Sequence, residues 1–148
     1  MAEQVIVGFQ AEEGAPAPLY ASEGASGADV RAFLKEEVEI APGAVFVVPT
    51  GLKFEIPQGY ELQVRSRSGL AAKYGIATLN SPGTIDWDYR GELKVILINH
   101  GKEPFIIEPG MRVAQIVVAP MLQARFAPAG ELSETARGSG GLGHTGLL

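Results

Sequence analysis

The sequence contains no cysteine and only two histidines among its 148 residues. Without cysteine the chain can form neither a disulfide framework nor a thiolate metal site, and two histidines are too few for a histidine-rich zinc centre. Any bound metal is therefore expected to be a hard cation with oxygen ligands. The N-terminus lacks an apolar run behind a basic patch, and no stretch approaches the roughly 20 apolar residues of a membrane-spanning helix. We therefore expect a cytoplasmic protein that does not insert into a membrane.

Basic residues are also scarce, because 12 lysines and arginines stand against 17 aspartates and glutamates, a formal charge of −5. Affinity for nucleic acid comes mainly from neutralising phosphates, so this balance argues against a nucleic-acid-binding protein. A small anionic ligand needs only a local basic patch. With 46% hydrophobic and 20% charged residues, the composition is that of an ordinary globular chain with one domain.

Long helical periods are absent as well, and short apolar segments alternate with glycine and proline. The segments expected to be strands are 4–9, 28–33, 38–40, 44–49, 51–56, 60–65, 75–79, 93–99, 105–107 and 112–119. Residues 52–56 and 61–65 alternate between apolar and polar, which is typical of strands with one face in water. The runs 95–98 and 113–118 are apolar almost throughout, which indicates cover on both faces by a second sheet or a neighbouring subunit. Turn pairs recur between these strands at the spacing of a β-sandwich or jelly roll.

Only one short helix is expected, from Ser68 to Lys73, with Ser68 as its N-cap and Gly75 beyond its end. Residues 12–27 have the composition of an extended surface loop, and residues 127–148 have too few apolar side chains for a core. The prediction is an all-β, jelly-roll-like sandwich or barrel over residues 1–126, followed by a flexible glycine-rich arm over residues 127–148.

The segment from Asn80 to Glu92 reads NSPGTIDWDYRGE and is flanked by apolar runs on both sides. We expect a hairpin with Pro82-Gly83 in its turn. Four polar or aromatic side chains should then lie around one bend: Asn80, Asp86, Asp88 and Tyr89. An amide can pair with a nucleobase edge, a carboxylate can take a proton from water, and an aromatic face can lie against a sugar. This combination suits a polar, planar ligand.

A second segment, Arg65 to Ala71, reads RSRSGLA and leads from a strand into the short helix. Guanidinium groups, a serine hydroxyl and the backbone N–H groups at a helix start can together form an anion site. A basic strand end with an ordinary serine cap is the alternative, and this motif alone favours that simpler interpretation.

A third segment, Arg137 to Gly146, reads RGSGGLGHTG and contains the spacing G-x-G-x-x-G. A dinucleotide fold is excluded because no strand precedes the glycines and too few residues follow for a βαβ unit. A disordered glycine tail is the common meaning of such composition. Two weaker segments are Ser26 to Asp29 and Gly110 to Gln115. Taken alone, Asp29 is more often a turn residue, and Gln115 is more often an interior amide with a backbone partner.

In this order, from residue 26 to residue 146, the five segments resemble the five motifs of the trimeric dUTPases. The resemblance implies that Asp86 activates water and that Asp29 holds waters around Mg2+. The substrate-binding residues that it implies are Arg67, Ser68, Gly69, Asn80, Thr84, Ile85, Asp86, Tyr89, Lys94, Gln115, Arg137, Gly140, Gly141 and Leu142. The family usually has an aromatic residue at Leu142, so stacking on uracil is expected to be weaker here.

The resemblance also implies a function, which is hydrolysis of dUTP to dUMP and pyrophosphate. That reaction limits uracil incorporation into DNA and supplies dUMP for thymidylate synthesis. The implied assembly is a homotrimer with three sites, each assembled from several subunits and closed by an arm from one of them. Two alternatives stay open: a dCTP deaminase, with or without hydrolase activity, on the same fold, and a non-catalytic β-sandwich that binds nucleotide or regulates a partner.

Overall fold

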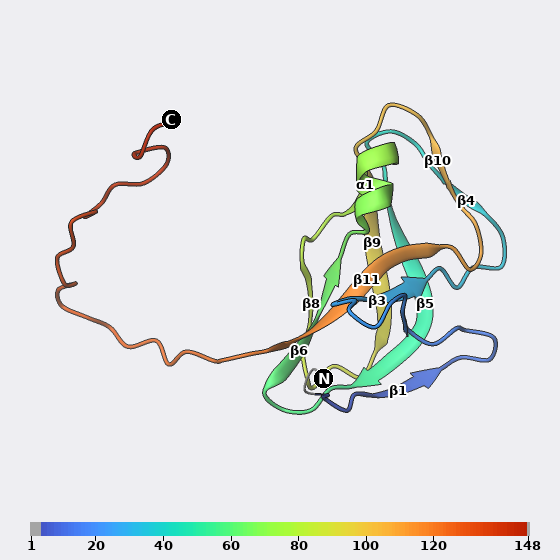
Figure 1. The fold of residues 1–148 in the computed structure, drawn as a ribbon, viewed down its shortest axis with the longest axis horizontal. Coiled ribbons are helices and arrows are strands. Elements are labelled where there is room, and N and C mark those ends of the chain that lie inside the picture. Colours follow the sequence, from blue (N-terminus) through green and yellow to red (C-terminus); the bar gives the residue numbers. More distant parts are fainter. Residues whose placement is uncertain (1–3, 148) are drawn as a thin grey trace.

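Two β-sheets pack face to face in the computed structural model, which describes residues 4–147 (Figure 1). One sheet has the strand order β1-β5-β9-β7, the other has the order β2-β3-β11-β6-β8, and β10 and β4 form a separate pair. The strands are β1 (Gly8–Ala11), β2 (Leu19–Tyr20), β3 (Ala28–Arg31), β4 (Val38–Ile40), β5 (Val45–Glu55), β6 (Tyr60–Arg65), β7 (Ile76–Thr78), β8 (Gly83–Ile85), β9 (Glu92–Asn99), β10 (Phe105–Ile107) and β11 (Arg112–Pro120), with a single helix α1 (Ser68–Tyr74) in the described part. The expected all-β fold with one short helix is confirmed.

The core lies between the two large sheets and is built from inward-facing residues at every second position. In β6 the buried residues are Leu62 and Val64, and in β9 they include Leu93 and Val95. Burying a side chain of this size contributes about 1.5–3 kcal/mol relative to exposure in water. The outward-facing residues of β9 are half-buried in the single chain, as Ile96 is, or exposed, as Lys94 is. The second sheet therefore covers one face of β9 and leaves the other partly open.

Three predicted strand boundaries match those in the structure, at 38–40, 60–65 and 105–107. The two segments predicted at 44–49 and 51–56 form one long strand, β5, instead. Gly51 allows this continuity because its φ of 69° accommodates the shift in pairing register with β9 between Pro49 and Lys53.

The first strand, predicted at 4–9, begins later than expected, at Gly8, and ends at Ala11, just before the segment that was expected to be loop. The loop itself contains a short strand, β2, which pairs with Ala28 and Asp29 of β3. β1 pairs with the distant β5 and β2 pairs with the nearby β3, and the local composition of β1 and β2 carries no signal for either pairing.

The predicted hairpin between residues 75 and 98 is correct in its pairing and wrong in its turn. Strands β7 and β9 pair antiparallel, with Ile76 opposite Asn99. Pro82-Gly83 does not form a tight turn between them, because Gly83 begins β8, which pairs with β6 of the other sheet. A Cβ on Gly83 would lie 3.2 Å from the Cβ of Val64, so glycine permits the close approach of these strands.

Helix α1 departs from the prediction at its start. Arg67 is the N-cap, with an extended backbone and no side-chain capping bond, and Ser68 is the first helical residue. The helix ends at Tyr74, one residue later than expected. Gly75 follows in the left-handed conformation and donates to carbonyls of the last turn, as a C-cap glycine does.

The chain leaves the sandwich after β11, and Figure 1 shows the C-terminal segment running outward from the body. Met121 still donates from its backbone N to the Gly59 carbonyl at 2.9 Å. Residues 122–147 belong to no strand or helix and are exposed apart from the half-buried Gly140. The arm predicted from residue 127 therefore lies within a longer extended segment, and residues 1–3 and 148 of the predicted domains lie outside the described residues. None of the helical structure in residues 4–147 is long and apolar enough to cross a membrane.

Candidate functional site

A cluster of charged side chains lies where β3, β11 and the end of β6 meet. The Asp29 carboxylate accepts from Arg67 Nε at 3.1 Å through Oδ1 and from Arg112 Nη1 at 3.1 Å through Oδ2. The Asp29 side chain is 14% exposed, whereas those of Arg67 and Arg112 are 27% and 43% exposed. Two guanidiniums around one carboxylate leave one positive charge in excess, and both arginine side chains are partly exposed. This cluster can therefore bind an anion even though the whole chain is acidic.

Gln115 joins this cluster from the middle of β11. It pairs with Asp29 on one side and Arg65 on the other, and its Nε2 donates to the Ser66 carbonyl at 3.0 Å. From the sequence, Gln115 taken alone was expected to be an interior amide with a backbone partner. The structure contains this arrangement. Gly27 makes room for this side chain, because a Cβ there would lie 2.9 Å from Gln115 Cδ and closer still to Oε1.

A chain of hydroxyl groups connects the charged cluster to the loop from Asn80 to Glu92. Ser66 Oγ accepts from the Thr78 backbone N at 2.9 Å and lies 3.2 Å from Thr78 Oγ1. Thr78 Oγ1 is in turn 3.0 Å from Ser81 Oγ, which donates to the Thr78 carbonyl. Thr78 is almost fully buried. The turn that carries Arg67 and the loop that begins at Asn80 are therefore held at a fixed spacing.

The loop itself is ordered by backbone bonds and carries exposed polar groups. Thr84 and Ile85 pair through β8 with Gln63 and Leu62 of β6. Immediately after β8, the backbone N of Tyr89 donates to the Asp86 carbonyl at 3.1 Å, which closes a bend. Around this bend Asp86, Asp88 and Tyr89 are exposed, whereas Trp87 packs partly against the core.

Asp86 and Asp29 therefore differ in their electrostatic surroundings. Asp29 is paired with two arginines, whereas Asp86 takes part in none of the ion pairs formed within residues 4–147. An exposed, unpaired carboxylate next to an aromatic ring has oxygens available to accept a proton from water. The bend from Asp86 to Tyr89 is thus the part of this loop best suited to chemistry.

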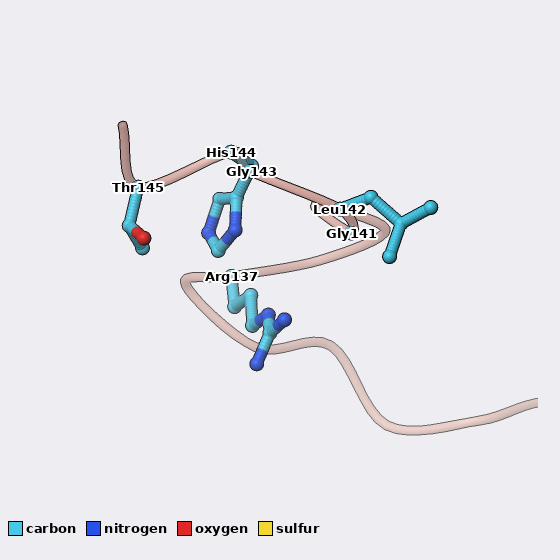
Figure 2. A pocket seen from close by; sticks show the side chains of 6 residues that line it. All are labelled: Arg137, Gly141, Leu142, Gly143, His144 and Thr145. Atoms are coloured by element: carbon cyan, nitrogen blue, oxygen red, sulfur yellow. The ribbon is translucent and has the colours of Figure 1, made fainter. Parts of the chain in front are cut away.

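The glycine-rich arm folds into a series of tight turns. The arm forms by itself an open hollow of about 480 Å³. Figure 2 shows the side chains of Arg137 and His144 close to one another at this hollow. Arg137 Nε donates to the Gly140 carbonyl at 2.8 Å, and further backbone bonds link Gly140 to Arg137 and His144 to Gly141. The Leu142 side chain is fully exposed and points away from the hollow. The arm therefore offers a guanidinium and an apolar side chain at a distance from the body.

The structure thus brings the predicted residues together in three groups. The charged cluster contains Asp29, Arg67 and Gln115, with Ser68 and Gly69 exposed at the adjoining start of α1. The loop group contains Asn80, Thr84, Ile85, Asp86 and Tyr89. The arm group contains Arg137, Gly140, Gly141 and Leu142. Lys94 stands apart, exposed on β9 opposite Pro49.

Sequence reasoning did not assign a role to several residues that complete these groups. Arg112 was quoted only as part of a motif, and its bond to Asp29 spans 83 positions in sequence. Thr78 and Ser81 were not singled out. A signal for Thr78 did exist, because it is a polar residue at an inward-facing position of an apolar strand, where a hydroxyl needs a partner.

A divalent cation is the cofactor that the resemblance implies, and Asp29 is its implied ligand. Both Asp29 oxygens face guanidiniums, and residues 4–147 contain no group of three or more His, Asp or Glu side chains suited to a metal. Mg2+ keeps several waters and commonly binds through one or two carboxylates together with substrate phosphates. The donor set therefore fits an Mg2+ that arrives on a nucleoside triphosphate and does not fit an all-protein metal cage.

Comparison with known proteins identifies close relatives. The chain is 60% identical over 136 residues to the deoxyuridine 5'-triphosphate nucleotidohydrolase of Chlamydia pneumoniae, a match that covers 91% of this chain and 94% of that protein. It is 59% identical over 138 residues to the protein of the same name from Chlamydia felis, with the same coverage.

Solved structures show the same fold at lower identity. A mutant dUTPase of Staphylococcus bacteriophage 80alpha, with dUpNHpp, superposes with a TM-score of 0.86 at 23% identity over 97% of this chain and 100% of that chain. A mutant dUTPase from phage phi11 of S. aureus, whose structure concerns a structural Mg(II) ion, has a TM-score of 0.75 at 23% identity over 86% and 98%. Finally, a sequence model of the dUTPase family matches residues 13–146. The chain belongs to the dUTPase family.

Proposed function

We propose that this protein hydrolyses dUTP to dUMP and pyrophosphate. The observation that carries the proposal is the link between two parts of the site. The loop with the free Asp86 carboxylate is held through Thr78 to the basic cluster around Arg67. A water-activating group and a phosphate-binding group at fixed spacing are what hydrolysis of a nucleoside triphosphate needs. The names and 60% identity of the chlamydial relatives support dUTP as the substrate.

In this mechanism Asp86 accepts a proton from a water molecule as the water oxygen attacks the α-phosphorus. The bond between the α-phosphorus and its bridging oxygen to the β-phosphorus breaks, and pyrophosphate leaves. The exposed position of Asp86 supports this role, because a water can reach its oxygens without displacing another charged partner. General base catalysis of this kind contributes typically about 10²–10⁴-fold to the rate.

Arg67, Gln115 and the backbone around Ser68 and Gly69 bind the phosphates, and Arg137 adds a second guanidinium when the arm closes. Asp29 orients Arg67 through the bond to Nε, and Arg67 Nη1 also donates to the Arg112 carbonyl at 3.5 Å. The remaining N–H groups of Arg67 would bind the anion. Asp29 would hold an Mg2+ ion through waters, and the bound ion would supply charge neutralisation on the phosphate oxygens.

Selectivity for deoxyuridine comes from the loop. The Asn80 amide and the backbone of Thr84 and Ile85 bind the uracil edge, Lys94 contributes backbone contact to the base, and the Tyr89 ring lies against the deoxyribose. A site built on such hydrogen bonds rejects analogues strongly, since a wrong ligand leaves buried polar groups unpaired. UTP, dTTP and dCTP are therefore expected to be poor substrates.

The working assembly that we propose is a homotrimer in the cytoplasm. Its support in this chain is the position of the arm, which runs outward from its own body and so is placed to close over a site on another copy (Figure 1). In that arrangement Gly140, Gly141 and Leu142 cover the nucleotide while Arg137 reaches its phosphates.

Pyrophosphate release with Mg2+, from dUTP beside UTP, dTTP and dCTP at equal concentration, tests the function. We expect release from dUTP alone. Ammonia released from dCTP would instead indicate the deaminase. If none of the four nucleotides reacted but dUTP bound, the protein would be a nucleotide-binding module.

A further inference from the structure

The ring of Tyr89 lies directly over Gly91, two residues further along the loop. A Cβ built on Gly91 would lie 2.5 Å from Tyr89 Cζ and 2.9 Å from Cε2, and closer still to Oη. Real Cβ atoms essentially never approach heavy atoms within 3.0 Å. Any residue other than glycine at position 91 must therefore displace the ring.

The backbone at Gly91 does not itself require glycine. Nine glycines of the described chain have positive φ, and Gly91 is not among them. Gly91 thus lies outside the left-handed region that favours glycine. The close approach of Tyr89 is thus the reason that the structure gives for glycine here.

The Tyr89 hydroxyl, which is the atom nearest the Gly91 Cβ position, is itself held by a hydrogen bond. It donates to the Glu92 carbonyl at 2.9 Å, and Glu92 begins strand β9, which pairs with both β5 and β7. The side chain is still 44% exposed, so one face of the ring remains open to a ligand. Contact with Gly91 and the bond to Glu92 together hold the ring in one position.

We propose that Gly91 is a positioning residue which sets the place of the Tyr89 ring and thereby the discrimination between deoxyribose and ribose. The inference rests on the proposed function, in which Tyr89 lies against the sugar. Rejection of a 2′-hydroxyl depends on a Tyr89 ring that cannot move away from the sugar, because a mobile ring makes room for one extra oxygen. Gly91 and the Glu92 carbonyl provide this rigidity.

The test is Gly91→Ala, with the ratio of kcat/KM for dUTP to kcat/KM for UTP as the readout. We expect the ratio to fall at least about tenfold, because the displaced ring no longer fits the deoxyribose and no longer excludes the ribose. The melting temperature should stay within about 2 °C, since the ring is at the surface and can shift without disturbing the core. Gly24→Ala is the matched control, because Gly24 has no positive φ and nothing within 4 Å of its Cβ position. It should leave the ratio unchanged.

A double-mutant cycle separates positioning from a merely structural effect. In a Tyr89→Ala background the ring is absent, so adding Gly91→Ala should change the ratio by less than about twofold. If Gly91→Ala lowered both kcat/KM values equally, or lowered the ratio as much without the ring as with it, the inference would be wrong. A wild-type protein that did not prefer dUTP to UTP would contradict the proposed function itself. If the wild type did prefer dUTP and Gly91→Ala left the ratio of the two kcat/KM values unchanged, this inference alone would be contradicted.

Discussion

Removing the arm should abolish most of the activity and leave the stability of the body unchanged. The change is a stop codon after Glu134, which deletes residues 135–148 and retains every strand. In the deleted segment Leu142 and Leu147 are 108% and 101% exposed. A leucine contributes about 1.5–3 kcal/mol only when it is buried. These leucines therefore contribute almost nothing to the folding of the body.

The hydrogen bonds lost with the arm also lie within the arm. They include Gly138 to Thr135, Gly140 to Arg137 and His144 to Gly141. The expected change in the free energy of unfolding is thus within about 0.5 kcal/mol, which is the range of surface changes. For a domain of this size it corresponds to a shift in melting temperature of about 2 °C or less.

The expected loss of activity is much larger. An arginine that stabilises charge on a transferring phosphoryl group is worth about 10³–10⁵ in kcat. We therefore expect the truncated protein to lose at least about 10³-fold in pyrophosphate release from dUTP. Arg137→Ala in the full-length chain is the matched variant, because it removes the guanidinium and keeps the arm. A fall in melting temperature of more than about 5 °C on truncation, or activity close to wild type, would refute the assignment of the arm as a lid.

Three further predictions concern the body of the site. Asp86→Asn should reduce turnover of dUTP to background, while the dUTP dissociation constant measured by calorimetry changes less than about fivefold. If this variant still hydrolysed dUTP, Asp86 would be ruled out as the base. Asp29→Asn leaves two guanidiniums without their anion. It should lower the free energy of unfolding in urea by about 1–2 kcal/mol. The loss is small because both arginines are partly exposed. No change in this free energy would mean that the two ion pairs of Asp29 contribute nothing to stability. Gly27→Ala should displace the Gln115 amide from the Ser66 carbonyl and lower kcat/KM for dUTP about tenfold, and an effect no larger than that of Gly24→Ala would contradict this.

Much of the sandwich could be predicted from the sequence because its strands carry local signals. Alternation marks Leu62 and Val64 as inward-facing, and both are buried. Strand β8 carries no such signal, since its three residues are held by pairing with β6 rather than by their own pattern. The N-cap of α1 was assigned to Ser68 on composition, but the preceding strand end places Arg67 there, already extended and directed at Asp29.

The candidate site residues likewise divide into those that carry a local sequence signal and those that do not. Motifs marked Asp86, Arg67 and Arg137 as candidate site residues because each lies in a compact run of distinctive residues. The partners of Asp29 could not be found by motif, because they lie 38 and 83 positions away and meet only when the sheets form. The need for glycine at position 91 is likewise a matter of space between side chains, which a sequence pattern does not contain.

Hydrolysis of dUTP in water enriched in oxygen-18 tests the central claim most directly. If water activated by Asp86 attacks the α-phosphorus, a single turnover places one labelled oxygen on dUMP and none on pyrophosphate, as mass spectrometry of the separated products would show. Label found in pyrophosphate would mean attack at the β-phosphorus. Either that result or release of orthophosphate in place of pyrophosphate would contradict the account.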